Sequence, residues 1–234
     1  MQQASLGKEE REKVFQLFLK NRQLRFSDIE EGVGIRSNNL SYHLEQMQKD
    51  GVITKDGELY TLTDKAEQMI PFFNQMTGKE VGVMPVVLVA IQHKGKICLL
   101  RREKRPYKGY WGLIGGKPKL QESIPEAALR EAKEETGLEC EFEKINAIVH
   151  ERVNEEGTMK HAFLLMLTTV KPKSDKLWES DEGKVAWFDS EKLDKSTIIP
   201  SDYWMIENHL KKQSAIPHVV LEQKGEEVIG FRVE

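Results

Sequence analysis

The chain has 234 residues, which is enough for one large or two small domains, each with a hydrophobic core. The formal net charge of −3 supplies no overall basic field, so a polyanion would have to be bound by a local group of cations. The two cysteines, Cys98 and Cys140, belong to no CxxC motif or Cys/His cluster, which argues against zinc and redox chemistry and predicts two reduced thiols.

The N-terminal segment MQQASLGKEEREK lacks the apolar core of a signal peptide. No window of the chain approaches the run of roughly 18 apolar residues that a membrane helix requires. These two observations predict a cytoplasmic protein with no membrane partner.

Residues 1–76 have a mostly helical pattern followed by a hairpin. Helices are expected in REKVFQLFLKN, in the segment after Ser27 as an N-cap, and in RSNNLSYHLEQMQKDG, which ends at Gly51. VITKDGELYTLT alternates as two strands around a Lys-Asp-Gly turn, and DKAEQMIPFFNQM predicts a closing helix. This order of elements resembles the winged helix-turn-helix domain of bacterial and archaeal transcription factors.

The resemblance implies a double-stranded DNA partner, with the third helix and the hairpin as the contacting elements. The candidate DNA-binding residues are Arg36, Asn38, Asn39, Tyr42, His43 and Lys55. Arg and Asn side chains can contact base edges. The segment through Met76 carries 10 Lys and Arg against 12 Asp and Glu, so its cations would have to lie on one face. A domain that serves dimerisation or protein contact stays open, as does a packing role for His43.

Residues 77–84 contain glycines and no periodicity, and are predicted to link this domain to a second one over residues 85–234. In the second domain, strands are expected in VVLVAIQHKGKICLLRR, EFEKINAIVHERV, KHAFLLMLTTV and KVAWFD, with a hairpin in HVVLEQKGEEVIGFRVE. A helix is expected in PSDYWMIENHLKK and another between VVLVAIQHKGKICLLRR and EFEKINAIVHERV. Strands alternating with a few helices predict an α/β/α sandwich with a mixed sheet, and an α+β chain overall.

The helix of the second domain lies within GGKPKLQESIPEAALREAKEETGL, where Ser123 and Glu126 form a capping box and Gly137 ends the helix. Glu131, Glu134 and Glu135 follow one another at a spacing that places them on one face. Two unit charges about 4 Å apart repel by roughly 4 kcal/mol at an effective dielectric near 20, so the cluster favours bound cations. Hard oxygen ligands select Mg²⁺ or Mn²⁺, whereas a solvated acidic face is the alternative for the run alone.

The residues around this cluster favour the metal site. Gly116, Glu122, Arg130, Ala132, the three glutamates, Gly137 and Leu138 fit every fixed position of the Nudix box, G-x5-E-x7-R-E-U-x-E-E-x-G-U with U apolar. Residues 81–234 therefore resemble the MutT-like Nudix hydrolases, and Ile114 stands where that family commonly has proline. The resemblance implies an enzyme that cleaves the pyrophosphate bond of a nucleoside diphosphate derivative, with Mg²⁺ or Mn²⁺ as cofactor.

The same resemblance implies roles for individual residues. The metal ligands would be the Gly115 carbonyl, Glu131, Glu134, Glu135 and one of Asp181 and Glu182. Arg130, expected to point to a neighbouring helix face, would orient the box carboxylates with Glu122, and catalysis would depend on Glu131, Glu134 and Arg130. The substrate-binding candidates are Arg102, Lys117 and Asp202. A solvated strand end is the alternative for Arg102, and a helix N-terminal acid is the alternative for Asp202.

Three functions stay open at this point. The order of ESDEGKVAWFDSEKL, IPSDYWMIENHLKK and a terminal hairpin resembles the eukaryotic MutT homologue that hydrolyses oxidised purine nucleoside triphosphates, although only one of that family's paired acids, Asp202, is present. RPYKGYWGL resembles a segment of ADP-ribose pyrophosphatases, but Val153 and Asn154 stand where those enzymes often carry proline. The third alternative is a nucleotide-sensing transcriptional regulator. A homodimer is expected by analogy with both families.

Overall fold

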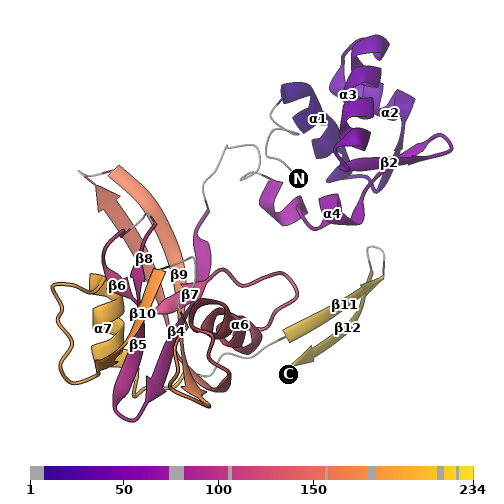
Figure 1. Ribbon diagram of the computed structural model, residues 1–234. Helices are drawn as coiled ribbons and strands as arrows, with labels where there is room; N and C mark the ends of the chain where they lie inside the picture. The colour runs from indigo at the N-terminus through magenta and orange to yellow at the C-terminus, as the bar shows by residue number, and fades with distance from the viewer. Residues whose placement is uncertain are drawn as a thin grey trace. The chain divides into compact units, whose positions relative to one another are not determined.

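The computed structural model describes residues 8–73, 82–104, 107–155, 158–178, 183–214, 219–224 and 227–233. The chain divides into two compact units, Met1–Gly82 and Val83–Glu234 (Figure 1). Within the described ranges, no helix combines the length and apolar character needed to cross a membrane. Both cysteines are free thiols, as predicted, and burial raises the pKa of Cys98 to about 12.

The first unit consists of short helices and one small sheet (Figure 1). Its elements are α1 (Glu9–Phe18), β1 (Gln23–Arg25), α2 (Phe26–Val33), α3 (Ser37–Lys49), β2 (Ile53–Asp56), β3 (Leu59–Leu62), α4 (Asp64–Glu67) and the 3-10 helix η2 (Ile70–Phe72). The strands form an antiparallel sheet in the order β1-β3-β2. The predicted hairpin is therefore confirmed, and β1 adds a strand that the sequence did not indicate.

The apolar faces of α1 and α3 form the core of this unit. Phe15 of α1 and Leu40 of α3 are fully buried, and the Phe15 ring stacks on Phe73 with ring centroids 5.1 Å apart. α2 ends at Gly34, whose φ of 71° is the left-handed conformation that glycine adopts without strain. The three helices thus enclose one core with the small sheet.

Two boundaries in this unit differ from the prediction. Ser27 is not the N-cap of α2, because the helix begins at Phe26 and the Asp28 carboxylate accepts the Arg25 N–H at 2.7 Å. The closing helix predicted over residues 64–76 is divided in its described part, since α4 covers one turn from a Thr63 cap and the 3-10 helix η2 follows; residues 74–76 lie outside the described residues. Thr63 accepts the Ala66 N–H, which fixes the start of α4.

The second unit contains a seven-stranded mixed sheet. Its elements are β4 (Met84–His93), β5 (Lys96–Arg102), β6 (Trp111–Gly112), β7 (Ile114–Gly116), α6 (Ile124–Thr136), β8 (Cys140–Glu155), β9 (Thr158–Pro172), β10 (Gly183–Asp189), α7 (Pro200–His209), β11 (Val219–Lys224) and β12 (Glu227–Val233). The main order is β10-β5-β4-β9-β8, with β6 on β5 and β7 on β4. Among the described pairs of strands in this sheet, β4 and β9 run parallel and the others antiparallel, which confirms the mixed sheet. The predicted terminal hairpin is also present as β11 and β12.

Alternate residues of β4 face the two helical layers of this sandwich. Val87 and Val89 pack with Ala128 and Ala132 of α6, whereas Leu88 packs in the cluster on the α7 side. All of these side chains lie in the buried interior, so β4 is apolar on both faces, as a central strand requires. Figure 1 shows α6 and α7 on opposite sides of the sheet. The α/β/α sandwich is therefore confirmed.

Candidate active site

The helix that carries the glutamates is fixed at both ends. The Ser123 N–H donates to the Glu126 carboxylate at 2.8 Å, while the Ser123 hydroxyl accepts the Glu126 N–H. Pro125 occupies the first turn, and Gly137 ends α6 with a φ of 72°. The predicted capping box and stop signal are both confirmed, so α6 presents its acidic residues at fixed positions.

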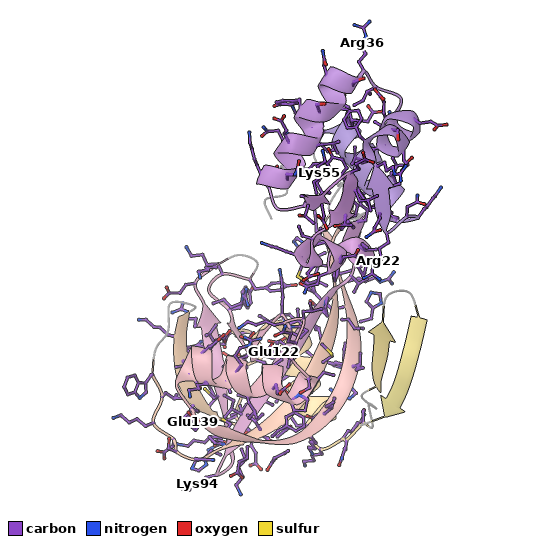
Figure 2. The ribbon with its side chains drawn as sticks, turned by 90° about the vertical axis from the view of Figure 1, so that its right-hand side faces the viewer. Arg22, Arg36, Lys55, Lys94, Glu122 and Glu139 are labelled. Atoms are coloured by element: carbon purple, nitrogen blue, oxygen red, sulfur yellow. The ribbon has the colours of Figure 1, made fainter. Side chains whose placement is uncertain are left out.

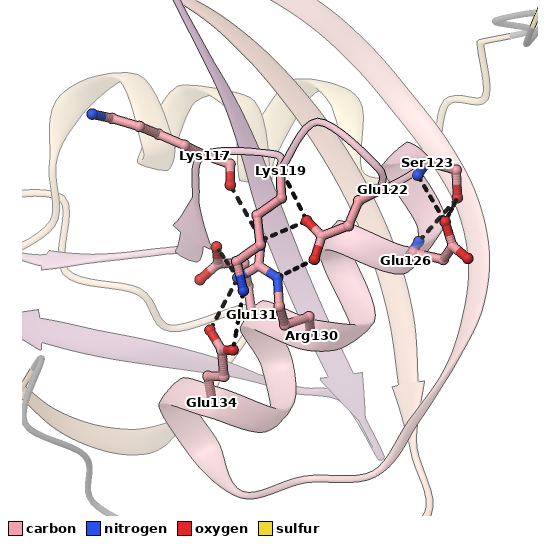
Figure 3. Close-up of polar contacts among 8 residues, drawn as sticks. All are labelled: Lys117, Lys119, Glu122, Ser123, Glu126, Arg130, Glu131 and Glu134. Carbon is pink, nitrogen blue, oxygen red and sulfur yellow. Dashed lines mark hydrogen bonds and ion pairs between the residues drawn. The ribbon is translucent and has the colours of Figure 1, made fainter. Parts of the chain in front are cut away.

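The Arg130 guanidinium lies at the centre of the acidic residues (Figure 3). It donates to both carboxylate oxygens of Glu122, at 2.5 and 2.9 Å, and to the Lys117 carbonyl at 3.2 Å. Its Nη1 donates to Glu131 at 2.6 Å and to Glu134 at 3.0 Å. The expectation that Arg130 points to a neighbouring helix face is therefore wrong, because its long side chain reaches back across the face that bears the glutamates.

The bidentate pair with Glu122 holds this guanidinium in place. Arg130 lowers the pKa of Glu122 to about 2, with the Lys119 N–H as a further donor, and Glu122 in turn raises the pKa of Arg130. A planar guanidinium fixed on both sides of its fork has little freedom to rotate. Glu122 thus acts as the anchor of Arg130, and Arg130 sets the positions of two box carboxylates.

The three box glutamates differ in burial. Glu131 and Glu135 are 7% and 8% exposed, whereas the Glu134 side chain is 54% exposed and also pairs with Lys119. The Glu131 carboxylate lies directly against Gly116 of β7, since a Cβ atom added to that glycine would come within 2.2 Å of Glu131 Oε1. The glycine therefore makes room for a carboxylate that would otherwise have to move.

The box glutamates are the candidate ligands of a divalent cation. The carboxylates of Glu131 and Glu134 already converge on one cationic nitrogen of Arg130, which stands in for the positive charge between them. In the described part of the chain, no group of three or more acidic, histidine or cysteine side chains is arranged as a metal site. The candidates Asp181 and Glu182 lie outside the described residues. The chemistry of the donors fits Mg²⁺ or Mn²⁺, because both ions prefer hard carboxylate oxygens.

A cavity of about 410 Å³ opens beside the box loop. Its polar lining includes Arg102, Lys117 and Asp202, so the structure brings the three predicted substrate-binding residues to one place. Gly115 and Gly116 of β7 line the same cavity. Because Gly116 lies against the Glu131 carboxylate, the cavity is next to the box glutamates. The remaining walls are Met84, Val86, Leu88, Tyr107, Glu151, Phe163, Leu165, Ile199 and Ser201.

Asp202 is a buried carboxyl at the start of α7. It accepts the Leu113 N–H at 2.8 Å and lies against Gly112, where an added Cβ would approach its Oδ2 at 2.8 Å. Burial raises the pKa of Asp202 to about 7, and the nearby charge of Glu151 adds to that shift. Asp202 thus has both predicted features, a first-turn position in the helix and a place in the cavity beside Arg102 and Lys117.

Two cavity residues, Tyr107 and Glu151, were missed from the sequence as candidates. The Tyr107 hydroxyl donates to Glu151 Oε1 at 3.5 Å, which links the loop after β5 to β8. Tyr107 lies in RPYKGYWGL, a segment that the sequence had singled out, whereas Glu151 is one of several glutamates on β8. No local pattern separates Glu151 from the others, since only the tertiary fold brings it to the cavity.

The candidate DNA-binding residues belong to the first unit. Arg36, Asn38, Asn39 and Tyr42 are exposed at the N-terminal half of α3, and Figure 2 shows Arg36 extending away from its unit. Lys55 is exposed on β2, with its ammonium 5.1 Å from the centre of the Tyr60 ring. His43 differs from the rest, because it is only 4% exposed and its ring is buried against α1, near Glu10.

Comparison with known proteins identifies the class of the second unit. Residues 83–208 match the NUDIX domain family, so the chain belongs to the Nudix hydrolase family, which acts on pyrophosphate bonds of nucleotide derivatives. Members of this family generally use a divalent metal such as Mg²⁺. Residues 3–72 match a domain of unknown function, DUF7347.

Individual relatives place the chain within that family. It is 30% identical over 152 residues to an oxidized purine nucleoside triphosphate hydrolase of Danio rerio, covering 61% of this chain and 94% of that protein. It is 25% identical over 146 residues to the uncharacterized Nudix hydrolase YvcI of Bacillus subtilis, covering 62% and 90%. The match to the human 8-oxo-dGDP phosphatase NUDT18 is 31% identical but spans only 31% of that protein.

Solved Nudix structures are also similar. A MutT NUDIX hydrolase from Burkholderia pseudomallei is 22% identical, with a TM-score of 0.48, and the match covers 54% of this chain and 98% of that one. A MutT protein from Methanosarcina mazei Go1 is 26% identical, with a TM-score of 0.47, covering 55% and 93%.

The adjacent glycines of β7 provide a matched pair of substitutions. In Gly116→Ala the new methyl meets the Glu131 carboxylate, the end of a side chain that can move. If Glu131 has the catalytic role predicted for it, its displacement should lower turnover on the order of 10²-fold, with little change in melting temperature. In Gly115→Ala the methyl meets the Val87 carbonyl at 2.3 Å, so the melting temperature should fall by the equivalent of about 1–3 kcal/mol. Thermal unfolding and nucleotide hydrolysis measure both; equal losses of stability in the two variants would contradict this account.

The raised pKa of Asp202 predicts a pH-dependent stability. Between its ordinary pKa of 3.8 and about 7, the folded protein keeps this proton while the unfolded chain releases it. The contribution of Asp202 to the free energy of unfolding is therefore fully present below about pH 4. This contribution is lost as pH rises to about 7, and the loss amounts to about 4 kcal/mol at most. Asp202→Asn keeps an acceptor for the Leu113 N–H and removes the titration, so its melting temperature should vary less over this range. An unchanged pH profile in Asp202→Asn would contradict the assignment.

Proposed function

We propose that the protein is a Mg²⁺- or Mn²⁺-dependent pyrophosphohydrolase that cleaves nucleoside triphosphates, oxidised purine nucleotides among them. One observation carries this proposal: the cavity that holds Arg102, Lys117 and Asp202 opens directly onto the glycines of the Nudix box. A nucleotide bound there would place its phosphates beside the box glutamates.

The residues of the box have distinct proposed roles. The Gly115 carbonyl, Glu131, Glu134 and Glu135 would hold the metal, together with Asp181 or Glu182. When bound, the metal would neutralise the phosphates and lower the pKa of a coordinated water. Arg130, fixed by Glu122, orients Glu131 and Glu134, and this is its role in catalysis.

The cations of the cavity are proposed to bind the phosphates. Arg102 and Lys117 both line it, and Lys117 follows the glycine pair directly, while its carbonyl bonds Arg130. Charge-assisted contacts to phosphate oxygens from these two side chains would favour a polyphosphate over a neutral ligand. The Danio rerio relative named as a purine nucleoside triphosphate hydrolase matches over 94% of its length and supports this substrate class.

ADP-ribose or another nucleotide sugar is the alternative substrate. An ADP-ribose pyrophosphatase of Methanocaldococcus jannaschii is 46% identical, but over 48 residues that make up 28% of that protein. This short match supports a shared Nudix box, but it says little about the residues that bind the rest of the substrate. We therefore place nucleoside triphosphates first.

Loss of one box carboxylate tests the catalytic proposal. Glu134→Gln keeps the size of the side chain but removes a charge that would bind metal or act as base, so turnover should fall on the order of 10²-fold or more. The matched control is Glu139→Gln, an exposed acid beyond the helix that pairs only with Lys133 among its described ion pairs. Hydrolysis should be measured with Mg²⁺ over canonical and oxidised nucleoside triphosphates, ADP-ribose and dinucleoside polyphosphates.

The outcomes separate the enzyme from a sensor. Wild-type turnover in Glu134→Gln would remove the catalytic assignment. Tight binding of one nucleotide with no hydrolysis of any by the wild-type protein would favour a nucleotide-sensing regulator. The expected homodimer and cytoplasmic location stay predictions.

A second function is proposed for the first unit, which we infer to be a winged helix-turn-helix domain that binds double-stranded DNA. The supporting observation is the exposed polar surface of α3 beside the β2–β3 hairpin, formed by Arg36, Asn38, Asn39, Tyr42 and Lys55. His43 is left out of this set, because its buried imidazole could reach DNA only if α3 separated from α1.

A salt titration tests the DNA proposal. Affinity for duplex DNA should fall steeply with ionic strength, because each neutralised phosphate releases counterions. Arg36→Ala should reduce the slope of log affinity against log salt by about one. Lys20→Ala, at an exposed position after α1 and outside the proposed DNA-binding set, should leave the slope unchanged. Absence of binding at low salt would favour a domain that contacts protein instead.

A further inference from the structure

We infer that Glu151 is a specificity-determining residue of the substrate cavity, where it recognises N–H groups of a nucleobase with Tyr107 and Asp202. This inference rests on the proposed hydrolase function and narrows its substrate to nucleotides whose base fills the cavity. Glu151 lies on β8, outside the Nudix box and outside every motif noted in the sequence.

Three acidic groups from three elements face the same cavity. Tyr107 comes from the loop after β5, Glu151 from β8 and Asp202 from the first turn of α7. The Tyr107 hydroxyl donates to Glu151, and the charge of Glu151 raises the pKa of both Tyr107 and Asp202 in addition to burial. The three groups therefore lie close enough to interact and form one acidic patch in the cavity wall.

The charge of this patch limits what can bind to it. A phosphate placed against Glu151 would meet a carboxylate, so the anionic part of a nucleotide should lie towards Arg102 and Lys117 instead. The remaining, uncharged part of the nucleotide must then face the patch. Because an ionised carboxylate only accepts hydrogen bonds, that part has to present donors, such as ring N–H or amino groups.

Asp202 complements Glu151 in this recognition. A carboxyl that is protonated near neutral pH can donate one hydrogen bond, whereas an ionised one can only accept. The pKa of Asp202 is raised to about 7 by burial, so it can serve as the donor beside an accepting Glu151. A base edge with both a carbonyl and an N–H group would satisfy the two side chains together.

The other walls of the cavity favour a flat ring over a sugar. Met84, Val86, Leu88, Phe163, Leu165 and Ile199 provide apolar surface around the acidic patch. Apolar walls with a few placed polar groups are typical of sites that bury an aromatic ligand, and about 410 Å³ is within the usual size range. A ribose, with hydroxyls on several sides, would leave many of them without partners there.

The backbone of Tyr107 also indicates a functional position. Its φ of 64° is in the left-handed region, which costs free energy for a residue with a Cβ atom. Such conformations are retained where the surrounding structure requires them, often at ligand sites. The contact of its hydroxyl with Glu151 at 3.5 Å is one such constraint on the Tyr107 side chain.

Purine nucleotides that differ by one amino group test this inference. GTP and ITP differ only by the 2-amino group, and ATP and purine riboside triphosphate only by the 6-amino group. We expect the wild-type protein to prefer the amino-bearing member of at least one pair, and Glu151→Gln to reduce that preference about tenfold in kcat/KM. The loss should lie mainly in KM, since Glu151 acts on the base and not on the phosphates.

Two further variants sharpen the comparison. Tyr107→Phe removes the hydroxyl that orients Glu151, so it should weaken the same preference by a smaller factor. Glu143→Gln removes an equal charge from an exposed site on the same strand and should leave both preference and KM unchanged. A thermal unfolding profile like that of the wild-type protein would show that Glu151→Gln is folded.

The inference is overturned if Glu151→Gln and Glu151→Ala both prefer the amino-bearing nucleotides by the same kcat/KM ratio as the wild-type protein. If those variants keep the preference while Glu134→Gln abolishes turnover, the hydrolase stands and the role of Glu151 fails. If the wild-type protein hydrolyses nothing, the hydrolase fails, and calorimetric binding of the same pairs without metal decides the role of Glu151. In that assay, the role of Glu151 would be contradicted if Glu151→Gln bound each nucleotide with the same affinity as the wild-type protein.

Discussion

The Arg130 guanidinium is the interaction on which the candidate active site depends. It is held by both oxygens of Glu122 and by the Lys117 carbonyl, and it in turn holds Glu131 and Glu134. Without this cation, carboxylates crowded on one helix face would repel one another. The box therefore brings its own counter-charge, which lets Glu131 and Glu134 lie close together.

The central strand β4 connects this cluster to the substrate cavity. One of its faces packs on α6, which carries the glutamates, and the other packs in the cluster that includes α7, which carries Asp202. β7 adds to β4 directly and places Gly116 beneath Glu131. The phosphate end and the base end of the proposed substrate site are thus fixed to the same strand, which limits their relative movement.

Much of this arrangement could be predicted from local sequence signals. Ser123, Glu126 and Gly137 marked the ends of α6, and alternation marked the long strands. The two- and three-residue strands β1, β6 and β7 are too short for a periodic signal, so they were missed. The direction of Arg130 and the place of Glu151 depend on contacts between distant segments. His43 follows Leu40 by three residues on the buried side of α3, so the helix spacing already allowed the packing role that its burial bears out.

The parallel pairing of β4 with β9 also affects how the protein folds. Val89 pairs with Thr168, so the whole box, its helix and β8 lie within the loop that this contact closes. Such a long-range pairing costs much chain entropy before it is stabilised by packing, and folds rich in such contacts form slowly. Box and cavity residues can therefore reach their final geometry only when the sheet closes, so catalytic competence during refolding should appear together with the complete sheet.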